Sequence, residues 1–141
     1  MTVTVEEILD RAVLEGYLTP AVAAEGPAHS VGFLRFGPLD GVSSPSGWSD
    51  PHGSGVVGPP AGALAVDLGT GGGIPGLVLA TLTMCRWVLV DRGERRGSFL
   101  RWAVRRLGLG DRVEVVVADA VEVGRGPLRG KANLGGICHP V

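Results

Sequence analysis

Three short apolar runs in the second half of the chain alternate with stretches whose apolar positions recur at helical spacing. The runs cover residues 63–68, 86–91 and 113–118, and they consist mainly of Val, Leu and Ala. Residues 75–83 and 94–107 lie between them, and the second stretch carries an apolar stripe: Phe99, Leu100, Ala103, Val104 and Leu107. Continuous apolar runs are typical of strands that are buried on both faces, so the pattern predicts an α/β fold with a parallel sheet.

The first 36 residues predict helices. Apolar residues recur at helical spacing across 3–18, and Thr4 with Glu7 matches a capping box, while a second short helix is expected over 20–24. Residues 37–62 differ, because twelve of these 26 residues are Gly or Pro and five more are Ser. We therefore expect an N-terminal helical segment over 1–36, a mobile loop or linker over 37–62 and a partial α/β domain over 63–141.

A glycine-dense segment follows the first apolar run, with the sequence Asp67-Leu68-Gly69-Thr70-Gly71-Gly72-Gly73-Ile74-Pro75-Gly76. Glycines allow positive φ angles and a close approach of the backbone to a ligand, and Pro75 suits the first turn of a helix. A dinucleotide fingerprint would need Gly at position 74, and a phosphate-binding P-loop would need Lys at position 77, which is Leu. The remaining pattern, an acid two residues before the first of the spaced glycines, resembles motif I of class I S-adenosylmethionine methyltransferases.

Acidic residues also end the second and third apolar runs. Asp91 lies 24 residues after Asp67, at a position where a parallel α/β unit presents a carboxylate that can accept both ribose hydroxyls. Asp119 follows the third run in the same way. The alternative for both residues is a helix N-cap, which is a common role for an acid in a strand-to-helix loop.

Charge is unevenly distributed along a chain whose formal net charge is only −1. Residues 1–67 carry eight acids and two bases, whereas residues 86–112 carry eight arginines and three acids. The predicted helix over 94–107 presents Arg95, Arg101 and Arg105, with Trp102 among them, and such a face can contact RNA phosphates and bases. An ordinary solvated helix face is the alternative.

Several classes of site and location find no support in the sequence. The two cysteines, Cys85 and Cys138, form no metal-binding pair, and no metal site is expected. No apolar stretch is long enough to cross a membrane, and the acidic N-terminus does not resemble a signal peptide. A cytoplasmic protein without a membrane partner is the expectation.

The glycine-rich segment continues as Leu77-Val78-Leu79-Ala80, and four short patterns follow it: Asp91, Arg95-Arg96, Phe99-Leu100 and Leu107-Gly108-Leu109. Taken together, these residues resemble the ribosomal RNA small subunit methyltransferase G family, also called glucose-inhibited division protein B. The resemblance covers residues 63–125. It implies a Rossmann-like class I methyltransferase fold with S-adenosyl-L-methionine as methyl donor. The implied substrate is a guanine in small-subunit ribosomal RNA, methylated at N7, so ribosomal RNA or the small ribosomal subunit is the expected partner.

The resemblance also implies roles for individual residues. The loop that contains Gly69, Thr70, Gly71 and Gly73 would lie along the methionine part of the cofactor, and Asp67 would hold that loop or the amino group. Asp91 would bind the ribose, and Asp119 and Ala120 would flank the adenine. The resemblance assigns no catalytic residue, because the family's target-base pocket usually comes from the fourth-strand region and beyond.

The tail departs from the family pattern. The family continues with an acidic, valine-rich fourth strand, whereas this chain has Asn133 at the acidic position and then Gly135 and Gly136. We therefore expect a sheet truncated after about three parallel strands, with an exposed first-strand edge that favours self-association. Two further functions stay open: a catalytically inactive half-domain that binds S-adenosylmethionine or RNA, and a methyltransferase that acts on a small molecule.

Overall fold

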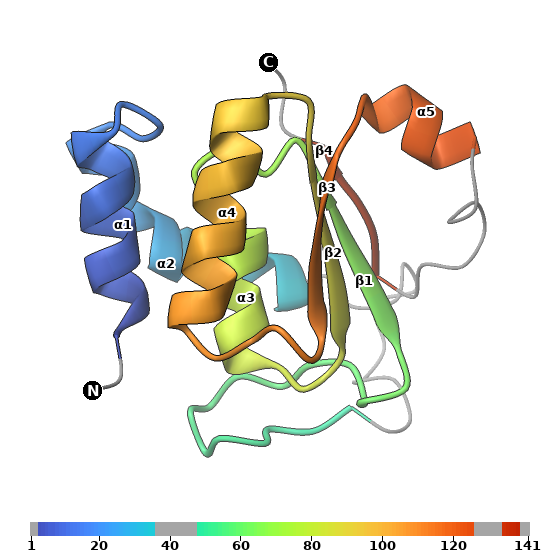
Figure 1. The fold of residues 1–141 in the computed structure, drawn as a ribbon. Coiled ribbons are helices and arrows are strands. Elements are labelled where there is room, and N and C mark those ends of the chain that lie inside the picture. The colour runs from blue at the N-terminus through green and yellow to red at the C-terminus, as the bar shows by residue number, and fades with distance from the viewer. Residues whose placement is uncertain (1–2, 36–47, 126–133, 139–141) are drawn as a thin grey trace.

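A single parallel sheet organises the fold, which Figure 1 shows as a computed structural model that describes residues 3–35, 48–125 and 134–138. The strands are β1 (Leu64–Leu68), β2 (Arg86–Asp91), β3 (Val113–Val117) and β4 (Leu134–Cys138), in the spatial order β3-β2-β1-β4. The first three agree with the predicted ranges to within one residue. The expected Rossmann-like α/β fold is confirmed.

Helices lie on both faces of this sheet. The helices α3 (Gly76–Leu82) and α4 (Glu94–Arg106) lie on one face together with the two N-terminal helices, and α5 (Ala120–Arg125) lies on the other (Figure 1). On the first face, side chains such as Trp87 and Leu89 from β2 pack with Leu77, Leu79 and Leu100 in one buried cluster. On the second face a smaller cluster joins Val66, Val88 and Val90. The alternation along β1 and β2 thus supplies a core on both sides of the sheet.

The first helix, α1 (Val5–Leu14), begins with the predicted capping box. The Thr4 amide donates to Glu7 Oε2 at 2.8 Å, and the Glu7 amide donates to Thr4 Oγ1 at 3.2 Å. The helix ends four residues earlier than expected, because Gly16 adopts a φ of +82° and the Tyr17 amide donates to the Ala12 carbonyl at 2.8 Å. This is the hydrogen-bond pattern of a glycine-terminated helix end.

The second helix, α2 (Pro20–Arg35), is much longer than the expected range of 20–24. Its interior contains Gly26, Pro27 and Gly32, all of which have low helix propensity. Tertiary packing compensates: a Cβ at Gly26 would collide with Ile74, and the buried Ser30 hydroxyl donates to the Gly26 carbonyl at 2.6 Å. The close approach of α2 to the glycine loop therefore stabilises a helix that its own sequence disfavours.

Part of the expected mobile loop over 37–62 has local structure. Residues 36–47 lie outside the described part of the chain, but Ser49 and Gly58 form an antiparallel bridge with N–O distances of 3.0 and 2.9 Å. Asp50 closes the intervening turn by accepting hydrogen bonds from the amides of Ser54 and Gly55. Trp48 packs against the larger core cluster. Residues 48–62 therefore form a loop with local hydrogen-bonded structure rather than a structureless linker.

The expected exposed edge at β1 is wrong. Strand β4 pairs with β1 in parallel, with Ala65 opposite Leu134 and Leu68 opposite Cys138, and the register shifts between Ala65 and Asp67. The two glycines of β4 weaken its strand propensity, but they do not remove its backbone donors and acceptors. Pairing satisfies the free backbone groups on that side of β1, so the proposed route to self-association through this edge is lost.

Candidate functional site

The carboxyl ends of β1, β2 and β3 bring three predicted site segments together. The amides of Gly69 and Thr70 donate to the Val90 carbonyl at 2.7 and 3.1 Å, which ties the glycine loop to the end of β2. The Ala118 amide donates to the Asp91 carbonyl at 3.0 Å, which ties the end of β3 to the same place. In open parallel α/β sheets, ligands bind in the crevice outside these strand ends.

The loop between β1 and α3 needs glycine for its backbone conformation. Gly69, Gly71 and Gly73 have φ angles of +77°, +56° and +103°. These angles lie in a region that side chains with a Cβ rarely adopt. At Gly72 the reason is space, because a Cβ there would lie 2.5 Å from Leu18 Cγ. The loop therefore turns tightly between the sheet and the N-terminal segment.

Asp67 lies beneath this loop and is fully buried. Its Oδ2 accepts a hydrogen bond of 2.8 Å from the Gly76 amide at the start of α3. Burial raises the pKa of Asp67 from 3.8 to about 7, because a charged carboxylate loses its hydration there. The Thr70 hydroxyl and the Gly76 amide lower the pKa only in part. Asp67 thus ties β1 to the start of α3 across the glycine loop; its contact with the cofactor stays a prediction.

Two buried side-chain oxygens among the described residues have no hydrogen-bond partner, and both belong to this loop region. They are Asp67 Oδ1 and Thr70 Oγ1. The Thr70 hydroxyl is near enough to lower the pKa of the Asp67 carboxyl, but the two oxygens do not meet the geometric criteria of a hydrogen bond. A buried polar atom without a partner costs about 1–3 kcal/mol. Because both atoms are closed off from solvent, the Thr70 hydroxyl is the group nearest to hand that can pair with the Asp67 carboxyl after a small shift.

Asp91, at the end of β2, accepts hydrogen bonds from both sides of the crevice. Its Oδ1 accepts from the Gly71 amide at 3.3 Å, and its Oδ2 accepts from the Gly93 amide at 2.8 Å and from Arg96 Nε at 2.7 Å. Sequence reasoning did not place Arg96 in the site. The available signal was its position in the first turn of a helix that follows directly on a strand-end acid, where an arginine can reach back to a carboxylate.

Asp119 and Ala120 occupy the loop after β3 and the first position of α5. The exposed Asp119 carboxylate accepts a hydrogen bond of 2.8 Å from the Val121 amide, and the Asp119 carbonyl accepts one of 3.1 Å from Val123. The carboxylate therefore caps the start of α5, as the alternative interpretation had it. The adenine contacts of these two residues stay a prediction.

The three predicted RNA-binding arginines are exposed on α4. Arg101 and Arg105 are four residues apart and share one side of the helix, whereas Arg95 lies about 120° around the axis from Arg101. Trp102 does not belong to a free aromatic surface, because its ring stacks at a tilt on Phe99 with a centroid separation of 5.7 Å. Arg95 therefore lies on a different side of α4 from Arg101 and Arg105.

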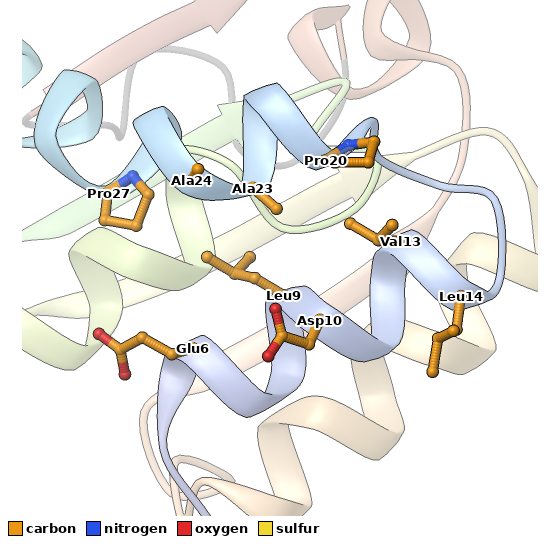
Figure 2. A pocket seen from close by; sticks show the side chains of 9 residues that line it. All are labelled: Glu6, Leu9, Asp10, Val13, Leu14, Pro20, Ala23, Ala24 and Pro27. Atoms are coloured by element: carbon orange, nitrogen blue, oxygen red, sulfur yellow. The ribbon is translucent and has the colours of Figure 1, made fainter.

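The pocket in Figure 2, of about 580 Å³, lies away from these residues, between α1 and α2. Its walls are mainly apolar, and its charged lining residues are Glu6 and Asp10, both on α1. None of the predicted cofactor or RNA residues lines it. Within the described ranges, no cluster of His, Cys, Asp and Glu is arranged for a metal ion, and no helix has the length and apolar character of a membrane span.

Comparisons with known proteins identify relatives of the segment that forms this crevice. The family profile described as rRNA small subunit methyltransferase G matches residues 59–128. A "Ribosomal RNA small subunit methyltransferase G" from Frankia alni is 44% identical over 69 residues, covering 48% of this chain and 26% of the relative. One of the same name from Salinispora arenicola is 48% identical over 68 residues, covering 48% of this chain and 28% of the relative.

The matched segment contains the glycine loop, Asp91, Arg96 and Asp119. It spans about a quarter of the length of these curated relatives. The segment 59–128, which forms this α/β unit, belongs to the rRNA small subunit methyltransferase G family.

Proposed function

We propose that the crevice at the ends of β1, β2 and β3 binds S-adenosyl-L-methionine, and that the protein methylates guanine N7 in small-subunit ribosomal RNA. The observation that carries this proposal is the joining of the glycine loop to Asp91 through the Gly71 amide, 3.3 Å from Asp91 Oδ1. This contact joins the backbone of the glycine loop to a carboxylate at the carboxyl edge of the sheet. The names of the relatives supply methyl transfer and the ribosomal RNA substrate, and the family resemblance supplies guanine N7 as the target atom.

The residues present suit this cofactor. The loop from Gly69 to Gly73, with positive φ angles at Gly69, Gly71 and Gly73, offers backbone groups to the methionine part. Asp91 offers an acceptor to the ribose, and residues 119–120 border the space for adenine. These roles are the ones that the family resemblance implies, and the residues concerned lie at the carboxyl edge of the sheet, where ligands bind in such folds.

The proposed reaction makes few demands on acid–base residues. When bound, the sulfonium of the cofactor supplies an electrophilic methyl group, and guanine N7 is already a nucleophile. The protein then contributes mainly by holding the two reactants in line, which is worth several kcal/mol by itself.

Arg101 and Arg105 supply the proposed contact to the RNA backbone, with Arg95 as a separate point of contact. All three are exposed, and no ion pair to an acid is found for them among the described residues. Contacts of this kind strengthen binding to any RNA and weaken with added salt. They position the substrate but do not select the target base.

The test is transfer of a labelled methyl group from S-adenosylmethionine to small ribosomal subunits, with the modified nucleoside identified by mass spectrometry. The proposal predicts N7-methylguanosine in the subunit RNA and its loss in an Asp91→Ala variant. Cofactor binding without any transfer would instead support a non-catalytic binding domain. Transfer only to small molecules would refute the RNA substrate.

A further inference from the structure

The glycine loop between β1 and α3 is covered near its middle by a side chain from the N-terminal segment. A Cβ added at Gly72 would lie 2.5 Å from Leu18 Cγ, 2.7 Å from its Cδ2 and 3.2 Å from its Cδ1, so the Leu18 side chain fills the space beside the Gly72 backbone. Gly72 is buried, and Leu18 is half-buried. At the neighbouring Gly71, an added Cβ would meet nothing within 4 Å. The loop is therefore covered by Leu18 at Gly72 and open at Gly71.

The reason for glycine at position 72 is this contact and not the φ angle of the backbone. Gly69, Gly71 and Gly73 have positive φ angles, but Gly72 does not, so its φ is one that alanine also adopts. The three atoms closest to a Cβ at position 72 all belong to Leu18. The contact between Leu18 and the loop is thus what excludes a larger residue here.

The link between α1 and α2 holds Leu18 in place. The amides of Tyr17 and Leu18 both donate to the Ala12 carbonyl at the end of α1, at 2.8 and 3.4 Å. The Tyr17 ring lies at a tilt on Phe99 of α4, with a centroid separation of 5.3 Å. Leu18 is therefore positioned by contacts with α1 and α4 that are separate from the glycine loop.

A loop built largely of glycine depends on such outside contacts for its conformation. Glycine gives the backbone its greatest conformational freedom, and a ligand that binds a freely moving loop must first order it. A loop that is already held in its binding conformation avoids that cost and binds more tightly. Hydrogen bonds to the Val90 carbonyl hold the start of this loop, and Leu18 supplies the packing at Gly72.

We propose that Leu18 is a positioning residue for the methyl donor: by packing on Gly72 it holds the glycine loop in the conformation that binds the cofactor. The inference rests on the proposed function, because it concerns the same cofactor site. It makes the N-terminal helical segment a working part of that site rather than a separate unit. Without the Leu18 side chain, the loop spends less time in the binding conformation, and the apparent affinity falls by the same fraction.

The experiment is isothermal titration of the full chain with S-adenosylhomocysteine, with the folding of each variant checked by circular dichroism. Leu18→Ala removes Cγ, Cδ1 and Cδ2, the atoms that cover Gly72, and we expect the affinity to fall about fivefold or more. Leu14→Ala is the matched control. It is the same substitution at a residue of α1 that is 79% exposed, and it should bind as tightly as the unmodified chain.

Gly72→Ala approaches the same contact from the loop. Alone it should weaken binding, because its Cβ collides with Leu18 and displaces the loop. In the double variant with Leu18→Ala, the new methyl group fills the space that the leucine atoms leave. The double variant should therefore bind more tightly than either single variant. A residue that only stabilised the fold would lower the free energy of unfolding but would not give this recovery of affinity.

Unchanged affinity in a folded Leu18→Ala protein would overturn the inference. A double variant that binds no better than Gly72→Ala would also overturn it, by making glycine at position 72 a requirement of the cofactor itself. Should Leu18→Ala fail to fold, unchanged affinity in Gly72→Ala would be the contradicting result. No binding by the folded, unmodified chain would refute the proposed function, and the role of Leu18 with it.

Discussion

Gly76 lies where α3 packs closely against the sheet, and Gly76→Ala tests this packing. A Cβ at this position would lie 2.5 Å from Asp67 Oδ2, 2.6 Å from Leu89 Cδ2 and 2.8 Å from Asp67 Cβ. Asp67 and Leu89 are both fully buried, so neither can move aside into solvent. The added methyl group would therefore push α3 away from β1 and β2.

The expected cost has two parts. Forcing an extra carbon into a packed core costs about 1–3 kcal/mol. Displacing the Gly76 amide from Asp67 Oδ2, now at 2.8 Å, leaves buried polar groups unpaired and costs about 1–3 kcal/mol more. Alanine recovers about 1 kcal/mol through its higher helix propensity. The free energy of unfolding should therefore fall by about 1–5 kcal/mol.

Denaturant unfolding, followed by circular dichroism, measures this change. Gly32→Ala in α2 is the matched control, because a Cβ there meets nothing within 4 Å. That variant should be more stable than the unmodified chain by about 0.5–1 kcal/mol. A Gly76→Ala protein as stable as the Gly32→Ala control would refute the packing argument.

Three further changes probe other buried contacts. Asp67 has a pKa of about 7 in the fold against 3.8 when unfolded, so its contribution to stability is full below pH 3.8 and is lost as the pH rises to about 7. Between pH 4 and pH 8, the free energy of unfolding of Asp67→Asn should therefore rise by about 4 kcal/mol relative to that of the unmodified chain. Denaturant unfolding of both proteins at the two pH values measures this difference, and parallel curves would contradict the prediction. Thr83→Val should lower the free energy of unfolding by about 1–3 kcal/mol, because the buried Trp87 Nε1 loses the hydroxyl that accepts its hydrogen bond at 2.9 Å. Adding Trp87→Phe to the Thr83→Val protein removes the unpaired N–H group and should recover part of this loss. Gly97→Ala should destabilise by about 1–3 kcal/mol through a collision with Val117, and a Val117→Ala partner that fails to relieve the loss would argue against that contact.

The sheet and the glycine loop were predictable from the sequence because local signals and tertiary packing agree there. Strand β2 is a continuous apolar run that is buried along almost its whole length, and α4 begins and ends close to its predicted limits. Helix α2 was not predictable, since its glycines and proline point away from a helix. What stabilises it is the contact of Gly26 with Ile74, which lies 48 residues further along the chain.

The site residues also fall into those that the sequence predicts and those that it does not. The positions of Asp67 and Asp91 followed from their place at strand ends, a rule that depends on topology alone. The capping contact of Asp119 and the ion pair of Arg96 depend on side-chain geometry, which spacing does not determine. The expected exposed edge of β1 was wrong because a five-residue strand with two glycines still pairs when a sheet offers free backbone groups.

The central claim is that the crevice beside Asp91 binds the methyl donor, and isothermal titration with S-adenosylhomocysteine tests it most directly. The comparison is between the unmodified chain, Asp91→Ala and Asp111→Ala, which removes an exposed acid just before β3. The account predicts binding by the unmodified chain and by Asp111→Ala, and affinity weakened about tenfold or more in a folded Asp91→Ala protein. Equal affinities in all three proteins, or no binding by the folded, unmodified chain, would contradict it.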